Sequence, residues 1–548
     1  MNKRGTPVTT FIKRITAALA LCLCLASLSG CREEDGSGGI FKYDIPANPQ
    51  SLDPQTASDS TSDMLIASIY KGLLVSNPDG SLGEGVAEDY TVSDDGLVYT
   101  FKLRQDNWWV DSGDFESQCT AHDFVFAFQR LFDPSTRAAR ASEYYCIKNS
   151  QPINRGMLPD LSQLGVKAIG DFELEITLDY PNPQFPVLLT QTPAMPCSEE
   201  YFLKSQGKYG LSAEKTPSNG SFYVKTWDYD PFTITDNNHI ILRRNYKNNE
   251  VSQIYPSGLN FFIVDEERFV SDFTSGVTSC IAVTDEQAMG IDGEYTVVDY
   301  SNISVGLLFN FDYSVFKNAD FRRSLASLVD RKDISAALSH YTISEGVVPE
   351  EVSMLDQSYR EYAGSSMLIE YNKGKAEYFF GKAEELLDKD QLIGARIILP
   401  DDSAVDAVSY IMQEWQKHLG FYCKMEVLSR EEYSKRLQNG DYEIAVAELG
   451  GGYNSPEAYL KCFTRDSSEN YSGYFNSELE KTLKRAGRAI DLSESADLYV
   501  EAEKHILSEA VFIPLFYKNE YFFIGEEMSD IFYNPFTKTI DFTIAKVE

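Results

Sequence analysis

The chain has 548 residues, of which 43% are hydrophobic and 13% aromatic, enough apolar surface for more than one folded domain. Its 83 acidic and 49 basic residues give a formal net charge of −34. Such acidity argues against a nucleic-acid partner, because phosphates would be repelled. Together with the high apolar content it indicates a charged exterior of a folded protein, not disorder.

The first 30 residues are typical of a bacterial secretory signal. Basic residues without any acid precede an apolar run over 15–28, which is too short to span a bilayer. The sequence Leu28-Ser29-Gly30-Cys31 looks like a lipobox, so we expect cleavage before Cys31 and lipid attachment to it. The charged, glycine-rich stretch 31–39 predicts a tether to a body that begins near residue 40. The expected location is therefore extracytoplasmic, anchored to the cell membrane.

Six cysteines remain beyond Cys31, and none forms a C-x-x-C pair. A structural zinc site is therefore not expected, while both buried thiols and disulfides remain open. No two of the five histidines stand four residues apart. The sequence predicts neither a metal site nor a cofactor.

The first half of the chain predicts mainly strands with turns between them, for example 97–103 after a Ser-Asp-Asp-Gly turn. One helix stands out. Thr120 and Asp123 form a capping-box pattern, and apolar residues follow at helical spacing from Phe124 until Asp133-Pro134 ends the helix.

The second half changes character. A helical stripe follows Asn318, and another helix is expected from Asp333. Strands and helices then alternate, which predicts an α/β sheet with helices packed on it. The expected strands are 395–399, 421–428 and 442–449, and the expected helices are 403–419, capped by Ser403, and 429–438, capped by Ser429.

The strand 442–449 leads directly into three glycines. Ligands of open α/β sheets bind beyond the carboxyl ends of strands. Gly450, Gly451 and Gly452 therefore have two interpretations, a flexible turn or a place where a ligand approaches the bare backbone.

Common catalytic motifs are absent. The sequence has no G-x-S-x-G elbow, no phosphate-binding loop, no complete G-x-G-x-x-G and no H-E-x-x-H. We expect no catalytic residue, although 83 carboxylates leave a glycosidase-like pair open as an enzymatic alternative.

Short segments in a fixed order carry a family resemblance. They are 48–54 (NPQSLDP), 70–73 (YKGL), 85–101, 120–128, 220–227 (GSFYVKTW), 308–325 and 510–516 (AVFIPLF). In this order they resemble the extracellular solute-binding proteins of the oligopeptide/dipeptide family, which deliver ligands to ABC importers.

The resemblance implies an α/β, two-lobed fold like that of periplasmic binding proteins, with a hinge between the lobes. The first lobe would comprise 40–262 and 508–548, with an extra subdomain at about 53–164, and the second lobe 263–507. A monomer would enclose its ligand by lobe closure.

One segment departs from the family. Peptide-binding members commonly carry an acid that pairs with the α-ammonium of the ligand, and Gly452 stands at that position here, with Leu449 in place of a tryptophan. A buried ammonium without a partner costs several kcal/mol, so Glu448 is considered as a substitute charge. The resemblance and the α/β pattern together predict these ligand-binding residues: Asn48, Glu448, Leu449, Gly450, Gly451, Gly452 and Tyr453.

The predicted function is a lipid-anchored, non-enzymatic binding protein that captures peptides and delivers them to the permease of an ABC importer. One alternative within the binding class is a protein for a non-peptide solute, such as a sugar or a metal chelate. A second class is a peptide sensor or pheromone receptor that presents its ligand to a signalling partner.

Overall fold

The computed structural model describes residues 38–77, 80–232, 238–337, 341–355, 357–364, 367–392, 394–401, 405–465, 467 and 469–547. The expected signal 1–30, Cys31 and most of the tether lie outside these residues. In the described part of the chain no helix is long and apolar enough to cross a membrane.

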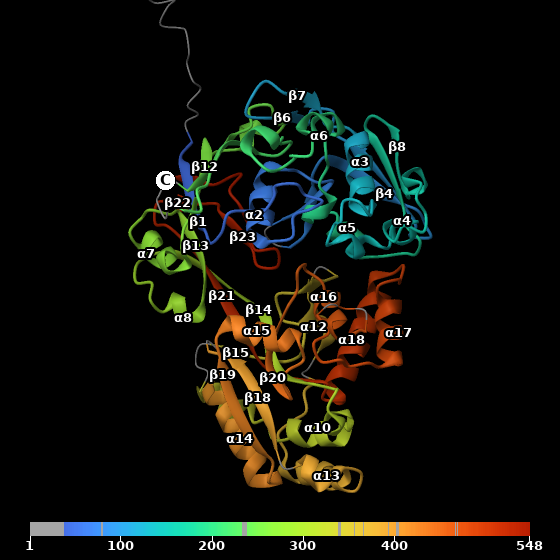
Figure 1. Cartoon of the computed structure of the whole chain (residues 1–548), viewed down its shortest axis with the longest axis vertical. Helices are drawn as coiled ribbons and strands as arrows, with labels where there is room; N and C mark the ends of the chain where they lie inside the picture. Colours follow the sequence, from blue (N-terminus) through green and yellow to red (C-terminus); the bar gives the residue numbers. More distant parts are fainter. Residues whose placement is uncertain are drawn as a thin grey trace, which may run out of the picture.

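Two bodies, each with its own apolar core, make up the molecule (Figure 1). The first lobe contains a four-stranded sheet in the order β1-β12-β11-β10, in which β1 and β12 are parallel and the other pairs antiparallel. Its strands are β1 (Ile40–Ile45), β10 (Phe222–Asp228), β11 (His239–Arg244) and β12 (Gly258–Ile263). The core of this lobe also takes in α2 (Ser60–Ile69) and C-terminal side chains from Ile531 to Ala545.

A second sheet of the first lobe has the order β4-β5-β9-β8 and joins strands on both sides of residue 164. The strands are β4 (Ala87–Val92), β5 (Val98–Leu103), β8 (Val166–Gly170) and β9 (Glu173–Thr177). The helix predicted beside it is confirmed as α3 (Ala121–Phe132), which begins with the Thr120 and Asp123 capping box and ends at Asp133. Phe124 and Phe128 of α3 are fully buried in the core.

The second lobe is built on a seven-stranded sheet, β13-β21-β14-β20-β18-β19, with β15 (Thr342–Ile343) on β21. Its strands are β13 (Cys280–Thr284), β14 (Thr296–Phe309), β18 (Gly394–Pro400), β19 (Tyr422–Leu428), β20 (Ile444–Gly450) and β21 (Phe512–Ile524). The predicted alternation is confirmed, because β18 runs parallel to both β19 and β20, with α14 (Val405–Leu419) and α15 (Arg430–Gln438) between them in the chain. Ser429 caps α15 as expected, whereas the predicted cap Ser403 lies outside the described residues.

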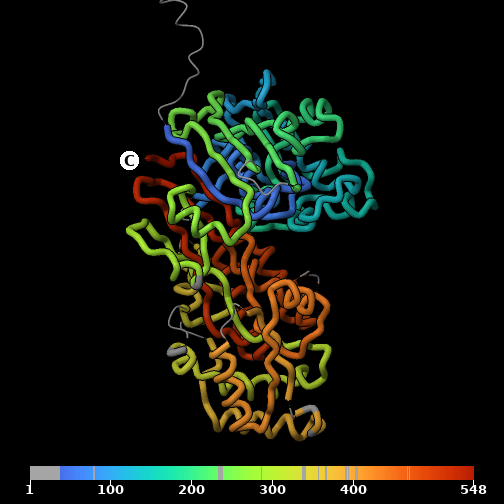
Figure 2. The backbone as a smooth tube through the Cα atoms, turned by 60° about the vertical axis from the view of Figure 1, so that its left-hand side comes forward, coloured from blue at the N-terminus to red at the C-terminus, as the bar shows by residue number. Residues whose placement is uncertain are grey.

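Two long antiparallel strands, β14 and β21, connect the lobes (Figures 1 and 2). Phe309 and Phe512 lie in the core of the second lobe, whereas Phe522 and Ile524 lie in that of the first. The two-lobed α/β fold is therefore confirmed, and the C-terminal end of the chain returns to the lobe that contains its beginning.

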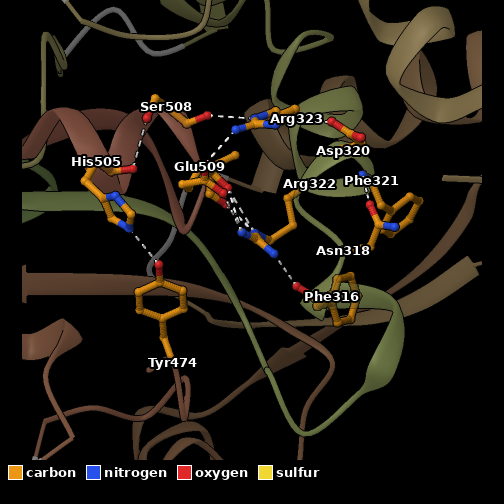
Figure 3. Close-up of polar contacts among 11 residues, drawn as sticks. Phe316, Asn318, Asp320, Phe321, Arg322, Arg323, Tyr474, His505, Ser508 and Glu509 are labelled. Carbon is orange, nitrogen blue, oxygen red and sulfur yellow. Dashed lines mark hydrogen bonds and ion pairs between the residues drawn. The ribbon is translucent and has the colours of Figure 1, made fainter. Parts of the chain in front are cut away.

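The Phe-Arg-Arg segment after Asn318 has a structural role (Figure 3). Arg322 donates to the carbonyl oxygens of Glu509 (2.8 Å) and Phe316 (2.6 Å), and Arg323 donates to that of Ser508 (2.9 Å) and to the Glu509 carboxylate (2.7 Å). Both guanidinium groups thus satisfy the C-terminal end of α18 (Leu492–Ser508) from α10 (Ala319–Ala326). Burial lowers the pKa of Arg322 to about 10.

The six cysteines beyond Cys31 are all described, and none of them forms a disulfide. Of the two possibilities that the sequence left open, the structure therefore has free thiols. Five are buried, and burial raises the pKa of Cys146, Cys197 and Cys423 to about 12. Such thiols are poor nucleophiles.

Candidate functional site between the lobes

A cavity of about 670 Å³ lies where the two lobes meet. The first lobe contributes the end of α2 with the turn after it, Thr190, Gln191 and Met195, residues 220–222, and residues 532–537 and 539–543 near the C-terminus. The second lobe contributes Glu350, Glu351, Ser353, Ser358 and Asn454, and Tyr300 comes from the connecting strand β14. A concave space of this size with walls from two lobes is a usual place for a small-molecule ligand.

Contacts between the lobes accompany this cavity. The guanidinium carbon of Arg488 in the second lobe lies 3.8 Å from the ring centre of Tyr180 in the first. Asn454 places its Nδ2 atom 2.8 Å from the point that a Cβ atom of Gly80 would occupy, and Gly80 has a φ of +80°. A glycine is therefore required at position 80 for two reasons: the backbone is left-handed there, and the other lobe approaches closely.

The cavity wall is partly aromatic and predominantly acidic. Its rings include Tyr70, Phe222, Tyr300, Phe532 and Phe536. Among the described residues, its charged members are one lysine and five acids: Lys71, Glu84, Glu250, Glu350, Glu351 and Asp541.

Glu351 is half-buried, and its Oε1 atom accepts a hydrogen bond from the backbone N–H of Ser301 (3.2 Å). Burial raises the pKa of this carboxyl above its ordinary value, and the nearby charges of Glu350 and Asp299 raise it further. Glu351 is thus an acid whose negative charge is poorly compensated.

The predicted ligand-binding segment comprises the last three residues of β20, 448–450, and the three residues that follow the strand. Leu449 and Tyr453 are buried in the core of the second lobe, and a Cβ atom on Gly451 would lie 2.6 Å from the ring of Tyr459. Gly450 and Gly452 are exposed, and no atom lies within 4 Å of a Cβ built on either. The three glycines therefore differ: Gly451 is needed for packing, whereas the other two leave the backbone open.

Glu448 is already paired. Its carboxylate accepts two hydrogen bonds from Arg430 (3.0 and 3.1 Å) and one from Lys518 on β21 (3.3 Å). The Lys518 side chain is only 8% exposed, against 47% for Arg430. The nearest ammonium group to this acid thus belongs to the protein itself.

Asn48 lies in the first lobe just after β1 and is half-buried. Its Oδ1 atom accepts a hydrogen bond from Trp227 Nε1 (2.8 Å). No hydrogen bond joins Asn48 to residues 448–453 in the described part of the chain.

None of the seven predicted residues is among the described residues that line the cavity, although Asn454, the next residue after Tyr453, is one of them. Sequence reasoning also missed Glu351 and Lys518. The sequence offered a signal for Asn454, because this residue continues the glycine segment. In the structure its Oδ1 atom accepts a hydrogen bond from the backbone N–H of Ser353 (2.8 Å). For Glu351 and Lys518 no local pattern was available.

Comparison with known proteins identifies the family. Residues 82–471 match the model of bacterial extracellular solute-binding proteins, family 5. The chain belongs to this family. The family resemblance drawn from the sequence is thereby confirmed, and membership makes the chain a solute-binding protein.

Among curated relatives, the probable deoxycholate-binding periplasmic protein YgiS of Escherichia coli is 26% identical, with 87% of this chain and 88% of the relative covered. The oligopeptide-binding protein OppA of Bacillus subtilis is 24% identical, with 97% of both chains covered. Similar solved structures include the pheromone receptor PrgZ (TM-score 0.72, 23% identity, 93% of this chain and all of that one) and OppA of Listeria monocytogenes bound to peptide (TM-score 0.69, 23% identity, 93% and 99%). At these identities the structures establish the shared fold.

Proposed function

We propose that this family member is a lipid-anchored substrate-binding protein that captures peptides between its lobes and delivers them to the permease of an ABC importer. The observation that carries the proposal is the cavity of about 670 Å³ whose walls come from both lobes. A ligand there contacts both lobes at once, so it favours the closed arrangement over any arrangement that separates them. The names of the relatives OppA and PrgZ support a peptide as the ligand.

The residues at the carboxyl end of β20 and directly after it are proposed to bind the main chain of the peptide. Gly450 and Gly452 are exposed and carry no side chain, and an extended peptide is proposed to add to this segment as a further strand does to a sheet. Leu449, Gly451 and Tyr453 hold this segment in place through their packing. Asn48 is proposed as the contact from the first lobe.

Glu448 is proposed to act in this site through its ion pairs with Lys518 and Arg430. Because its charge is already compensated, the free α-ammonium of a peptide gains little there. We expect binding that depends weakly on the peptide amino terminus.

The membrane anchor is proposed to be a lipid on Cys31, followed by the tether 31–39. The test is Cys31→Ser in the full chain, which is expected to leave a folded, ligand-competent protein that no longer sediments with membranes. Membrane association of the variant that survives a carbonate wash would contradict the lipid anchor.

The ligand class is tested by native mass spectrometry of the protein purified from residue 32 onward, followed by denaturation and identification of what it releases. A heterogeneous set of peptides is the expected result. A single non-peptide mass would replace the proposal by a non-peptide solute, the alternative favoured by the similarity to YgiS. If the protein is empty, a thermal-shift screen with peptide pools and bile acids is used, since a ligand that binds only the folded state stabilises it by RT ln(1 + [L]/Kd).

A further inference from the structure

The charges on the wall of the cavity do not balance. Lys71 pairs with Glu250, and Glu84 pairs with Arg104, which stands outside the wall. Glu350, Glu351 and Asp541 make no ion pair within the described residues. The neighbouring Lys538 is already paired with Glu520 at 2.5 Å. Three carboxylates of the cavity are therefore left without a cation from the described part of the chain.

These three acids come from opposite lobes. Glu350 and Glu351 precede β16 (Ser353–Met354) in the second lobe, and Asp541 ends β24 (Thr539–Asp541) in the first. Each carboxylate adds to a negative potential in the space between them, and low-dielectric walls concentrate that potential. A cation between the walls would be attracted by both lobes, whereas an anion would be repelled by both.

Glu351 is the member best placed to bind such a cation. It is half-buried, so its charge has lost part of its hydration, while Glu350 and Asp299 repel it. One of its oxygens accepts from Ser301, and the other makes no hydrogen bond with a described residue. Rings of Tyr300 and Phe536 belong to the same wall, and the faces of aromatic rings attract cations.

We propose that this cavity is a subsite for a cationic group and that, in a captured peptide, it receives a lysine or arginine side chain with Glu351 as its main partner. The peptide part of this inference rests on the proposed function, whereas the preference for a cation rests on the cavity itself. The inference goes beyond the family relationship because it predicts which peptides are favoured.

The experiment measures the affinity of the protein from residue 32 onward by isothermal titration calorimetry. The probes are alanine peptides of three to six residues that carry one lysine, one Nε-acetyl-lysine or one glutamate, each with a free and an acetylated amino terminus, together with spermidine. Acetylation of the lysine side chain is expected to lower affinity at least tenfold, as for loss of a hydrogen bond to a charged group. Acetylation of the amino terminus is expected to change it less than threefold.

Variants assign the effect to the cavity. Glu351→Gln is expected to weaken binding of the lysine peptides about tenfold and to leave the acetyl-lysine peptides within twofold. Asp541→Asn, on the opposite and exposed wall, is expected to act in the same direction, so the test does not depend on one variant remaining folded. Glu361→Gln is the matched control, because it removes the same charge from an exposed position of the second lobe outside the cavity wall.

The outcomes separate this inference from the proposed function. Equal affinity for lysine and acetyl-lysine peptides would overturn the inference and leave peptide capture intact. Binding of spermidine that depends on Glu351, without binding of any peptide, would uphold the cation subsite and overturn peptide capture. Absence of binding by every probe, or binding of glutamate peptides in preference to lysine peptides, would overturn the inference.

Discussion

Replacement of Asp44 by asparagine is expected to stabilise the protein at alkaline pH but not at pH 5. Asp44 lies on β1 and is 5% exposed, and neither of its carboxylate oxygens has a hydrogen-bond partner among the described residues. It faces Asp272, which is paired with Arg268 at 2.9 Å. Burial, and then repulsion by Asp272, raise the pKa of Asp44 to about 7, with Arg268 opposing them.

The sign follows from proton linkage. The folded state holds the Asp44 proton up to about pH 7, whereas the unfolded chain releases it near pH 3.9, so stability falls as pH rises between these values. At about 1.4 kcal/mol per pKa unit, the full penalty above pH 7 is about 4 kcal/mol. Asparagine removes the charge but remains a buried polar group, so we expect a net gain of about 2 kcal/mol at pH 8.

The assay is urea denaturation of the protein from residue 32 onward at pH 5 and pH 8. The gain in unfolding free energy from Asp44→Asn should be larger at pH 8 than at pH 5 by roughly 2.5 kcal/mol. Asp94→Asn, at an exposed turn position before β5, controls for loss of one negative charge. A gain of equal size at both pH values, or a loss at pH 8, would refute the reasoning.

Three further predictions concern the ligand site. Gly452→Asp has open space for its side chain, so it is expected to raise affinity for free-amine peptides over N-acetylated ones about tenfold, measured by calorimetry; equal affinities would remove position 452 from the site. Lys518→Met removes the buried cation of the two that pair with Glu448, so a threefold to tenfold preference for free amines is expected, and an unchanged ratio would contradict the role given to the pair. Arg488→Ala removes a contact between the lobes and is expected to speed ligand release twofold to fivefold in stopped-flow measurements; unchanged release would show that this contact does not stabilise the closed form.

Local sequence determined the elements of this protein. Helical spacing and a capping box were sufficient for α3, and the β-α-β-α-β pattern after residue 394 was correct in type and close in its bounds. Both signals are local. Each element is recognised within fewer than about 20 residues, because the side-chain period of a helix differs from that of a strand. The motifs in fixed order were enough for the family, and the family carries the two-lobed fold.

Only the tertiary structure decided how the charges are placed. Glu448 looked like a bare acid in the sequence, but β14 brings β20 and β21 into one sheet, where Lys518 reaches that acid from 70 positions away. The acidic cavity likewise joins residues near 71, 351 and 541, which share no local pattern. Such contacts depend on topology, because the chain can bring distant carboxylates together only after its apolar cores have fixed the strands that carry them.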